Sequence, residues 1–219
     1  MQIGIANVLT AAEIANARAV LAKAVFKDGR LTAGWAARGV KDNEQAQMTT
    51  EVAALREQIA GRIEGNSVFA LAVRPKRLVS LMFAKYGPGQ AYGSHVDNAL
   101  MDGARTDVAF TLFLAEPGSY DGGELVIEQA AGDDAIKLEA GGLFAYPATT
   151  LHRVAPVTRG ERLVLVGWVR SYVRDASQRE LLFDLDTARR GLFDRHGKTA
   201  EADLLSKCSA NLLRQWAED

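Results

Sequence analysis

The feature that most constrains the fold of this chain is a series of short apolar segments between residues 68 and 174. These segments are rich in Val, Leu, Ile and aromatic residues, and stretches rich in Gly, Pro, Asp and Asn separate them. No long helical pattern interrupts the series, which argues against a parallel α/β sheet. Many short strands with such punctuation are typical of an antiparallel sandwich or barrel. The segments read RLVSLMFAKY, DVAFTLFLA, GELVIEQ, IKLEAGGLFAYP and RLVLVGWVRSYV.

Helical patterns flank this region on both sides. Thr10 and Glu13 have the spacing of a capping box, and apolar residues then recur at helical intervals as far as Phe26. A second helix is expected near residues 49–63, and leucine spacing predicts two more after residue 176. The sequence therefore predicts a mainly β fold with helical flanks (α+β). Its expected parts are an N-terminal helical segment (1–67), a β core (68–174) and a C-terminal helical subdomain (175–219).

Composition limits the cellular compartment and the kinds of binding partner that can be expected. The chain has 219 residues and is 48% hydrophobic, which is enough to bury a core. A net charge of −1 gives no support for binding to nucleic acid or to an anionic membrane. Neither a signal peptide nor an apolar run near the ~20 residues of a membrane span is seen. Cys208 is the only cysteine, which excludes an internal disulfide and a multi-thiolate zinc site. We expect a cytoplasmic protein without nucleic-acid or membrane partners.

A histidine and an aspartate, His95 and Asp97, stand two positions apart in the extended-looking segment YGSHVDNALM. In a strand such side chains leave on the same face, about 6.5 Å apart. His196, flanked by charged residues in LFDRHGK, is expected in a solvated turn, which leaves His152 as a third ligand. Two imidazoles and a carboxylate suit non-haem Fe(II). Zinc hydrolases use the same ligands, so this set alone does not fix the metal.

Arg162 follows His152 along the chain and precedes the apolar run LVLVGW. A cation inside a barrel is costly unless an anion meets it. A guanidinium group matches a carboxylate in two parallel hydrogen bonds. The site could therefore hold a small dicarboxylate, with one end on the metal and the other at Arg162. The alternative is an outward-facing arginine at a strand edge.

The order His95, Asp97, His152 and Arg162 within a strand-rich region resembles the Fe(II)- and 2-oxoglutarate-dependent dioxygenases. The likeness is to the prolyl-hydroxylase-like branch, and above all to the bacterial PKHD-type hydroxylases associated with iron uptake. It covers most of the chain, including the helical C-terminal part. The fragments that carry it are DGRLTAG, KYGPGQAYGSHVDNALM, DGGELVIE and YPATTLHRVAPVTRGER.

This resemblance implies a double-stranded β-helix (jelly-roll) core that holds iron near one open end. It implies that His95, Asp97 and His152 are the iron ligands and that Arg162 binds the distal carboxylate of 2-oxoglutarate. Fe(2+), 2-oxoglutarate and O2 are the cofactor and co-substrates that it implies, with L-ascorbate (vitamin C) as an expected reductant. Asp97 favours hydroxylation over halogenation, because the related halogenases have a small residue in its place.

Further residues fall at pocket-lining positions of the family. Tyr86 and Tyr92 align with tyrosines beside the co-substrate, and Leu125 and Trp168 also match lining positions. Each of the four fits equally well as a core residue. Asn98, directly after the metal motif, either supports the ligands or caps a strand end.

The expected reaction is hydroxylation of an unidentified substrate, a peptidyl residue or a small iron-related metabolite, with release of succinate and CO2. A cupin-like metal-dependent hydrolase or isomerase and a non-catalytic iron- or 2-oxo-acid-sensing module are the alternatives. The loops 41–47 and 97–107 are candidates for a lid over the site. Leucines at 204, 205, 212 and 213 form an apolar stripe. This stripe either packs on the chain's own core or forms a homodimer contact through the C-terminal helices.

Overall fold

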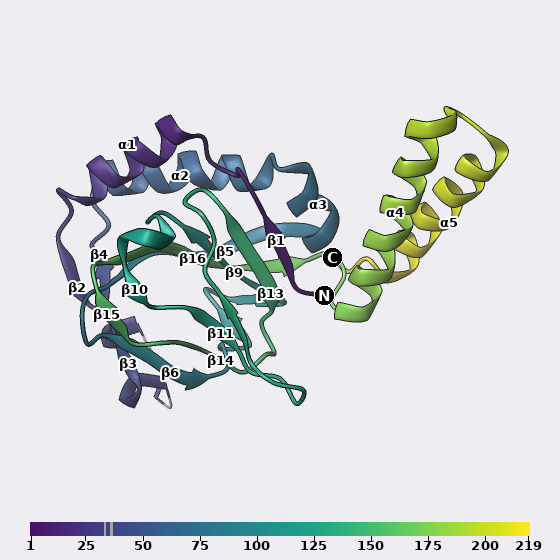
Figure 1. Ribbon diagram of the computed structural model, residues 1–219. Coiled ribbons are helices and arrows are strands. Elements are labelled where there is room, and N and C mark those ends of the chain that lie inside the picture. Colours follow the sequence, from purple (N-terminus) through teal and green to yellow (C-terminus); the bar gives the residue numbers. More distant parts are fainter. Residues whose placement is uncertain (33, 36) are drawn as a thin grey trace.

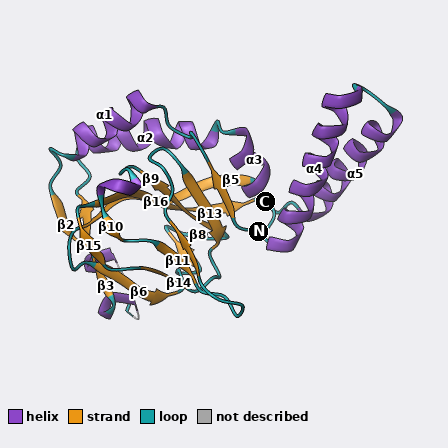
Figure 2. Cartoon of the chain, viewed as in Figure 1, coloured by secondary structure: helices purple, strands orange, loops and turns teal. Residues whose placement is uncertain are grey.

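The computed structural model describes residues 1–32, 34–35 and 37–219. Two antiparallel sheets face each other, helices cover the outer face of one of them, and a helical hairpin extends from the C-terminal side (Figure 1). Figure 2 shows that strands dominate the centre of the molecule and helices its periphery. This arrangement confirms the jelly-roll core with helical flanks that the sequence predicts.

The larger sheet has seven strands, with β9 and β16 at its centre. In spatial order the strands are β1 (Ile3–Ile5), β13 (Leu143–Pro147), β9 (Val108–Phe113), β16 (Arg162–Ser171), β5 (Pro75–Tyr86), β4 (Glu44–Ala46) and β2 (Phe26–Asp28). Every residue of β9 is buried. The reason is that alternate side chains enter two different cores, one beneath the helices and one between the sheets. Such a strand shows no polar alternation in its sequence.

The smaller sheet has five strands, and it carries both histidines of the predicted metal set. In spatial order the strands are β12 (Asp134–Ile136), β11 (Leu125–Ile127), β14 (His152–Val154), β6 (Ala91–His95) and β3 (Lys41–Asp42). Strands β14 and β6 pair so that His152 lies opposite His95. Sheet pairing therefore brings together two histidines that are far apart in the sequence. A separate two-stranded ribbon joins β10 (Asp121–Gly122) to β15 (Val157–Arg159).

The N-terminal segment contributes helices and strands. The helices α1 (Ala11–Leu21), α2 (Thr50–Glu64) and α3 (Ser67–Val73) lie along one side of the seven-stranded sheet (Figure 1). The predicted capping box is confirmed, since Thr10 and Glu13 hydrogen-bond reciprocally. Helix α1 ends five residues before Phe26, at Leu21, because Phe26 begins β2 and pairs with β4. Strand β1 joins the larger sheet through β13.

Both segments considered as lids have regular structure. Residues 41–46 form β3 and β4, which pair with β6 and β5, so the prediction of a loop there is wrong. In the second segment, β7 (Leu100–Met101) and β8 (Ala104–Arg105) form a small hairpin. Positive φ angles at Asp102 and Gly103 give it the tight turn that such hairpins require.

The C-terminal region forms an antiparallel hairpin of α4 (Ala176–His196) and α5 (Ala200–Trp216), which projects away from the sheets (Figure 1). On α4 a buried carboxylate, Asp186, accepts hydrogen bonds from Arg74 at the end of α3, from Arg189 on the same helix and from Ser209 on α5. Leu204 stays 58% exposed. No helix in the described part of the chain has the length and apolar character needed to cross a bilayer.

Candidate active site

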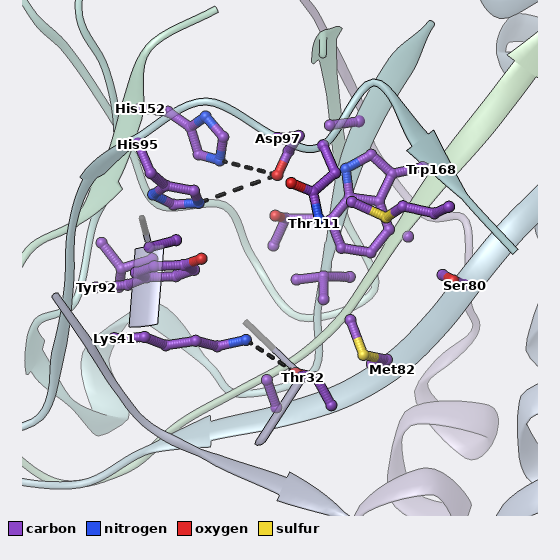
Figure 3. Close-up of a pocket in the computed structure, with 18 of the residues that line it drawn as sticks. Thr32, Lys41, Ser80, Met82, Tyr92, His95, Asp97, Thr111, His152 and Trp168 are labelled. Carbon is purple, nitrogen blue, oxygen red and sulfur yellow. Dashed lines mark hydrogen bonds and ion pairs between the residues drawn. The ribbon is translucent and has the colours of Figure 1, made fainter. Parts of the chain in front are cut away.

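A cavity of about 460 Å³ lies between the two sheets (Figure 3). This volume is in the range of sites that hold drug-sized ligands. All the site residues predicted from the sequence line it: Tyr86, Tyr92, His95, Asp97, Leu125, His152, Arg162 and Trp168. Asn98 lines it too, and its backbone carbonyl accepts a hydrogen bond from Thr106. His196 is exposed at the end of α4, as expected for a solvated residue.

The side chains of His95, Asp97 and His152 converge at one end of this cavity (Figure 3). The Nε2 atoms of His95 and His152 lie 4.0 and 3.9 Å from Asp97 Oδ1. All three candidate ligand atoms lie within 4.8 Å of one another. Two metal bonds of about 2.1 Å can together span roughly 4.2 Å. The three side chains are therefore arranged to bind a single cation.

Both histidine rings are held in the orientation that metal binding needs. Nδ1 of His95 is 2.9 Å from the Gly93 carbonyl oxygen, and Nδ1 of His152 is 3.0 Å from that of Thr150. When each Nδ1–H donates to its carbonyl, the Nε2 lone pair faces the centre of the site. Burial, reinforced by the neighbouring His152, lowers the pKa of His95 to about 3. This ring is therefore neutral at pH 7, as a metal ligand must be.

Asp97 is a buried carboxylate that lacks the partners it needs. Its side chain is 5% exposed, and Oδ2 has no hydrogen-bond partner among the described residues. Burial raises the pKa of Asp97, although His152 and the indole N–H of Trp168 act in the opposite direction. Trp168 Nε1 is itself without a completed hydrogen bond in the described structure. A bound cation would satisfy this carboxylate, so the residues fit a metal.

Arg162, the first residue of β16, is 1% exposed. Its guanidinium carbon lies 5.0 Å from the ring centroid of Tyr86 and 5.7 Å from that of Phe113. Nε and Nη1 have no hydrogen-bond partner within residues 1–32, 34–35 and 37–219. A buried cation surrounded by rings is stable only when an anion pairs with it. Arg162 therefore fits the carboxylate of a small acid in the same cavity as the three candidate ligands.

The remaining predicted residues surround these two groups. The ring of Tyr92 stacks on that of His95, with centroids 3.6 Å apart. Tyr86 lies opposite Arg162 in the pairing of β5 and β16. Leu125 is 2% exposed and Trp168 is 8% exposed, so both are lining and core residues at once.

Sequence reasoning missed a row of polar residues in the segment that contains β3 and β4. Lys41, Asn43 and Gln45 are buried and line the cavity. Burial lowers the pKa of Lys41 to about 8, against the opposing influence of Asp97. The segment KDNEQ is polar at every position, so its sequence does not show which side chains face inward.

Tyr120 was also missed. Its ring and the Arg162 side chain both approach Gly123, at 3.1 Å from the position that a Cβ atom would take there. The Tyr120 hydroxyl is buried and has no hydrogen-bond partner in the described structure. The Tyr120 hydroxyl is therefore a second polar group near Arg162. The sequence did not predict this role, because Tyr120 lies in a segment, EPGSYDGGE, that reads only as a turn.

Comparisons with known proteins agree with this geometry. The family model of the 2OG-Fe(II) oxygenase superfamily matches residues 81–170, and that of the PKHD-type hydroxylase C-terminal domain matches residues 176–218. A PKHD-type hydroxylase of Picosynechococcus is 55% identical over 98% of both chains. One from Acaryochloris marina is 54% identical over the full length of both.

A solved structure gives the same fold at lower identity. A prolyl-4-hydroxylase of Pseudomonas putida superposes with a TM-score of 0.53 at 24% identity, covering 78% of this chain and 92% of that one. This likeness concerns the fold alone. The relatives with half or more of their residues identical settle the family. This chain belongs to the PKHD-type hydroxylases of the 2OG-Fe(II) oxygenase superfamily.

Proposed function

We propose that this hydroxylase uses Fe(II), 2-oxoglutarate and O2 to hydroxylate a C–H bond of a peptidyl residue or a small iron-related metabolite. The balanced reaction consumes one 2-oxoglutarate and one O2, places one oxygen atom in the product hydroxyl, and releases succinate and CO2. One observation carries the proposal. The His95, Asp97 and His152 side chains converge in the same cavity as the buried, unpaired guanidinium of Arg162.

Three residues would hold the metal. His95 and His152 offer Nε2 lone pairs, and Asp97 offers a carboxylate oxygen and one negative charge. When bound, iron(II) supplies the redox chemistry that couples decarboxylation of a 2-oxo acid to hydroxylation. The carbonyls of Gly93 and Thr150 fix the two rings, so little reorganisation is needed when the metal binds.

Arg162 would bind the distal carboxylate of 2-oxoglutarate. The rings of Tyr86 and Phe113 flank the guanidinium and exclude water from it. A charge-assisted bond is strongest in such a dry setting, and it fixes the position of the reactive 2-oxo end. The buried Tyr120 hydroxyl is available to support the same carboxylate.

The test compares two histidine substitutions under anaerobic conditions. The full-length protein with Fe(II) and 2-oxoglutarate should show the weak visible charge-transfer band of a chelated 2-oxo acid, and succinate should form when air is admitted. His152→Ala should lose the band and about 100-fold or more in metal affinity. His196→Ala, the same change at an exposed histidine, should behave like wild type. A His152→Ala protein that keeps both the band and succinate formation would refute the proposal.

The alternatives drawn from the sequence receive no support from the comparisons, because the related proteins are hydroxylases. Succinate release by the purified protein would also argue against a non-catalytic sensing module. The ascorbate requirement, the link to iron uptake, the cytoplasmic location and a homodimer through the C-terminal helices stay predictions.

A further inference from the structure

The wall of the cavity at residues 41–45 carries buried polar side chains that the proposed reaction does not use. Lys41, Asn43 and Gln45 are 7%, 3% and 8% exposed and face the cavity. Asp42 and Glu44, between them, form ion pairs outside it, with Arg30 and Lys85. This alternation is that of an extended chain, in which every second side chain enters the barrel. Buried polar groups are costly, so a row facing a cavity calls for a ligand.

Lys41 is the charged member of this row. Its Nζ atom lies 3.2 Å from Thr32 Oγ1 and 5.1 Å from the centroid of the Tyr92 ring (Figure 3). An ammonium group has three donors, and in the described part of the chain only Thr32 accepts one of them. The Thr32 hydroxyl in turn donates to Gln45 Oε1, 2.8 Å away. Lys41 is therefore held in place across the cavity with donor capacity to spare.

The cavity thus contains two cations on opposite sheets. Arg162 begins β16 of the seven-stranded sheet, whereas Lys41 lies on β3, at the edge of the five-stranded one. Each lies over a different tyrosine, Tyr86 for Arg162 and Tyr92 for Lys41. One dicarboxylate chelated at the metal has a single distal carboxylate to pair with these cations. Arg162, the more deeply buried, offers the planar geometry that fits it.

We propose that Lys41 is the anion-binding residue of the substrate site, so that the molecule hydroxylated carries a carboxylate group. This inference rests on the proposed function, because Arg162 must be occupied by 2-oxoglutarate for Lys41 to remain available. Asn43 lies on the same wall and lines the cavity, although its Oδ1 atom packs against Gly29 and does not face the substrate. Val96 and Leu100 line the cavity yet stay exposed, so its mouth contacts an apolar part of the substrate.

The experiment uses acetate as the probe and the isosteric acetamide as its neutral match. Full-length protein labelled with ¹³C-lysine is loaded with zinc(II) and 2-oxoglutarate and titrated by NMR. The Lys41 Cε resonance is assigned by its loss in Lys41→Arg, which keeps the charge. We expect it to shift saturably with acetate, with a Kd on the order of 10 mM, and not with acetamide. Lys207, exposed on α5, is the internal control.

Affinity for 2-oxoglutarate supplies the second measurement. Lys41→Met should bind it within about threefold of wild type, whereas Arg162→Met should lose about 100-fold, a difference of about 2.7 kcal/mol. A Lys41 shift no more saturable than that of Lys207 would overturn the inference. So would a Lys41→Met protein as impaired in 2-oxoglutarate binding as Arg162→Met, since Lys41 would then belong to the co-substrate site.

The two proposals fail in different ways. If wild type binds no 2-oxoglutarate in the presence of metal, the proposed function is wrong. The acetate titration is then repeated on the metal-free protein, where a saturable shift at Lys41 still identifies an anion site. If 2-oxoglutarate binds and acetate does not, only the inference about Lys41 is wrong.

Discussion

Arg162 is surrounded by aromatic rings where a buried arginine ordinarily meets a carboxylate. Because its burial carries a desolvation penalty, the free enzyme retains the guanidinium at a cost in stability, which an anionic ligand offsets. The same logic explains why Asp97 keeps an unpaired oxygen beside the two histidine rings. At the residue scale, the site is therefore arranged to bind a cation at Asp97 and an anion at Arg162, and the protein chain supplies neither.

Replacing Arg162 by Met should therefore separate two properties. Affinity for 2-oxoglutarate should fall by about 100-fold, because the carboxylate is left buried without a cation. Metal affinity in the absence of 2-oxoglutarate should stay within about threefold, because Arg162 contacts none of the three ligands. Calorimetric titration measures both constants. Arg159→Met, on the neighbouring exposed strand β15, should change neither, and equal losses in the two arginine variants would contradict the assignment.

The residues of the site also differ in how far the sequence alone predicts their role. The sequence was enough to single out four residues, because the chain has only three histidines and the family pattern gives the order of the set: His95, Asp97, His152 and Arg162. Lys41 could not be identified, because its inward orientation depends on pairing between β3 and β6, which no local pattern indicates.

At the scale of elements, one buried carboxylate, Asp186, links the C-terminal hairpin to the end of α3. Burial by itself would raise the pKa of Asp186, but hydrogen bonds from Arg74 and Arg189 outweigh it and lower the pKa. A lowered pKa means that the ionised carboxylate stabilises the fold. This stabilisation is complete well above the unfolded-state pKa of about 3.9 and is lost as the pH falls below it.

Asp186→Asn should therefore lower the free energy of unfolding at pH 7 by about 2 kcal/mol, since two guanidinium groups lose their counter-charge. Denaturant unfolding measures the difference from wild type. The gap should narrow as the pH falls below about 4, because the unfolded chain is protonated there first and the native carboxylate only at the lower pH set by its lowered pKa. Asp194→Asn, at an exposed position of the same helix, should be nearly neutral. A gap that is unchanged at low pH would show that charge is not the cause.

Elements differ in how far their sequences predict them. Helix α1 follows from a capping box, and strand β16 follows from a run of leucine and valine residues. Strands β3 and β4 have two and three residues and are polar throughout, so only their partners define them. The hairpin β7–β8 depends on a turn with positive φ at Asp102, which sequence alone rarely reveals.

At the scale of the whole molecule, the sequence predicted the two-sheet core. It did not predict the N-terminal strands that complete both sheets. Punctuated apolar segments indicate an antiparallel sandwich or barrel. They do not indicate that the N-terminal segment adds β1, β2 and β4 to one sheet and β3 to the other. Those additions place Lys41, Asn43 and Gln45 in the lining of the cavity, with Lys41 beside Tyr92 on the sheet that carries His95. They depend on contacts distant in sequence.

Amide hydrogen exchange should report the two sheets separately. Zinc(II) alone should slow exchange in β6 and β14, whose side chains it joins, because a ligand stabilises the state that it binds. Adding 2-oxoglutarate should extend the slowing to β16 and β9 of the other sheet. In Arg162→Met the second effect should vanish and the first remain. Protection of β16 by metal alone would contradict this division.

The placement of the histidines on one sheet and of Arg162 on the other has a mechanical consequence. In the proposed function, a co-substrate bound to the metal at one end and to Arg162 at the other would link the two sheets, and the succinate formed from it is one carbon shorter. We therefore expect the link between the sheets to be weaker once succinate has formed, which would favour opening of the cavity when the product leaves.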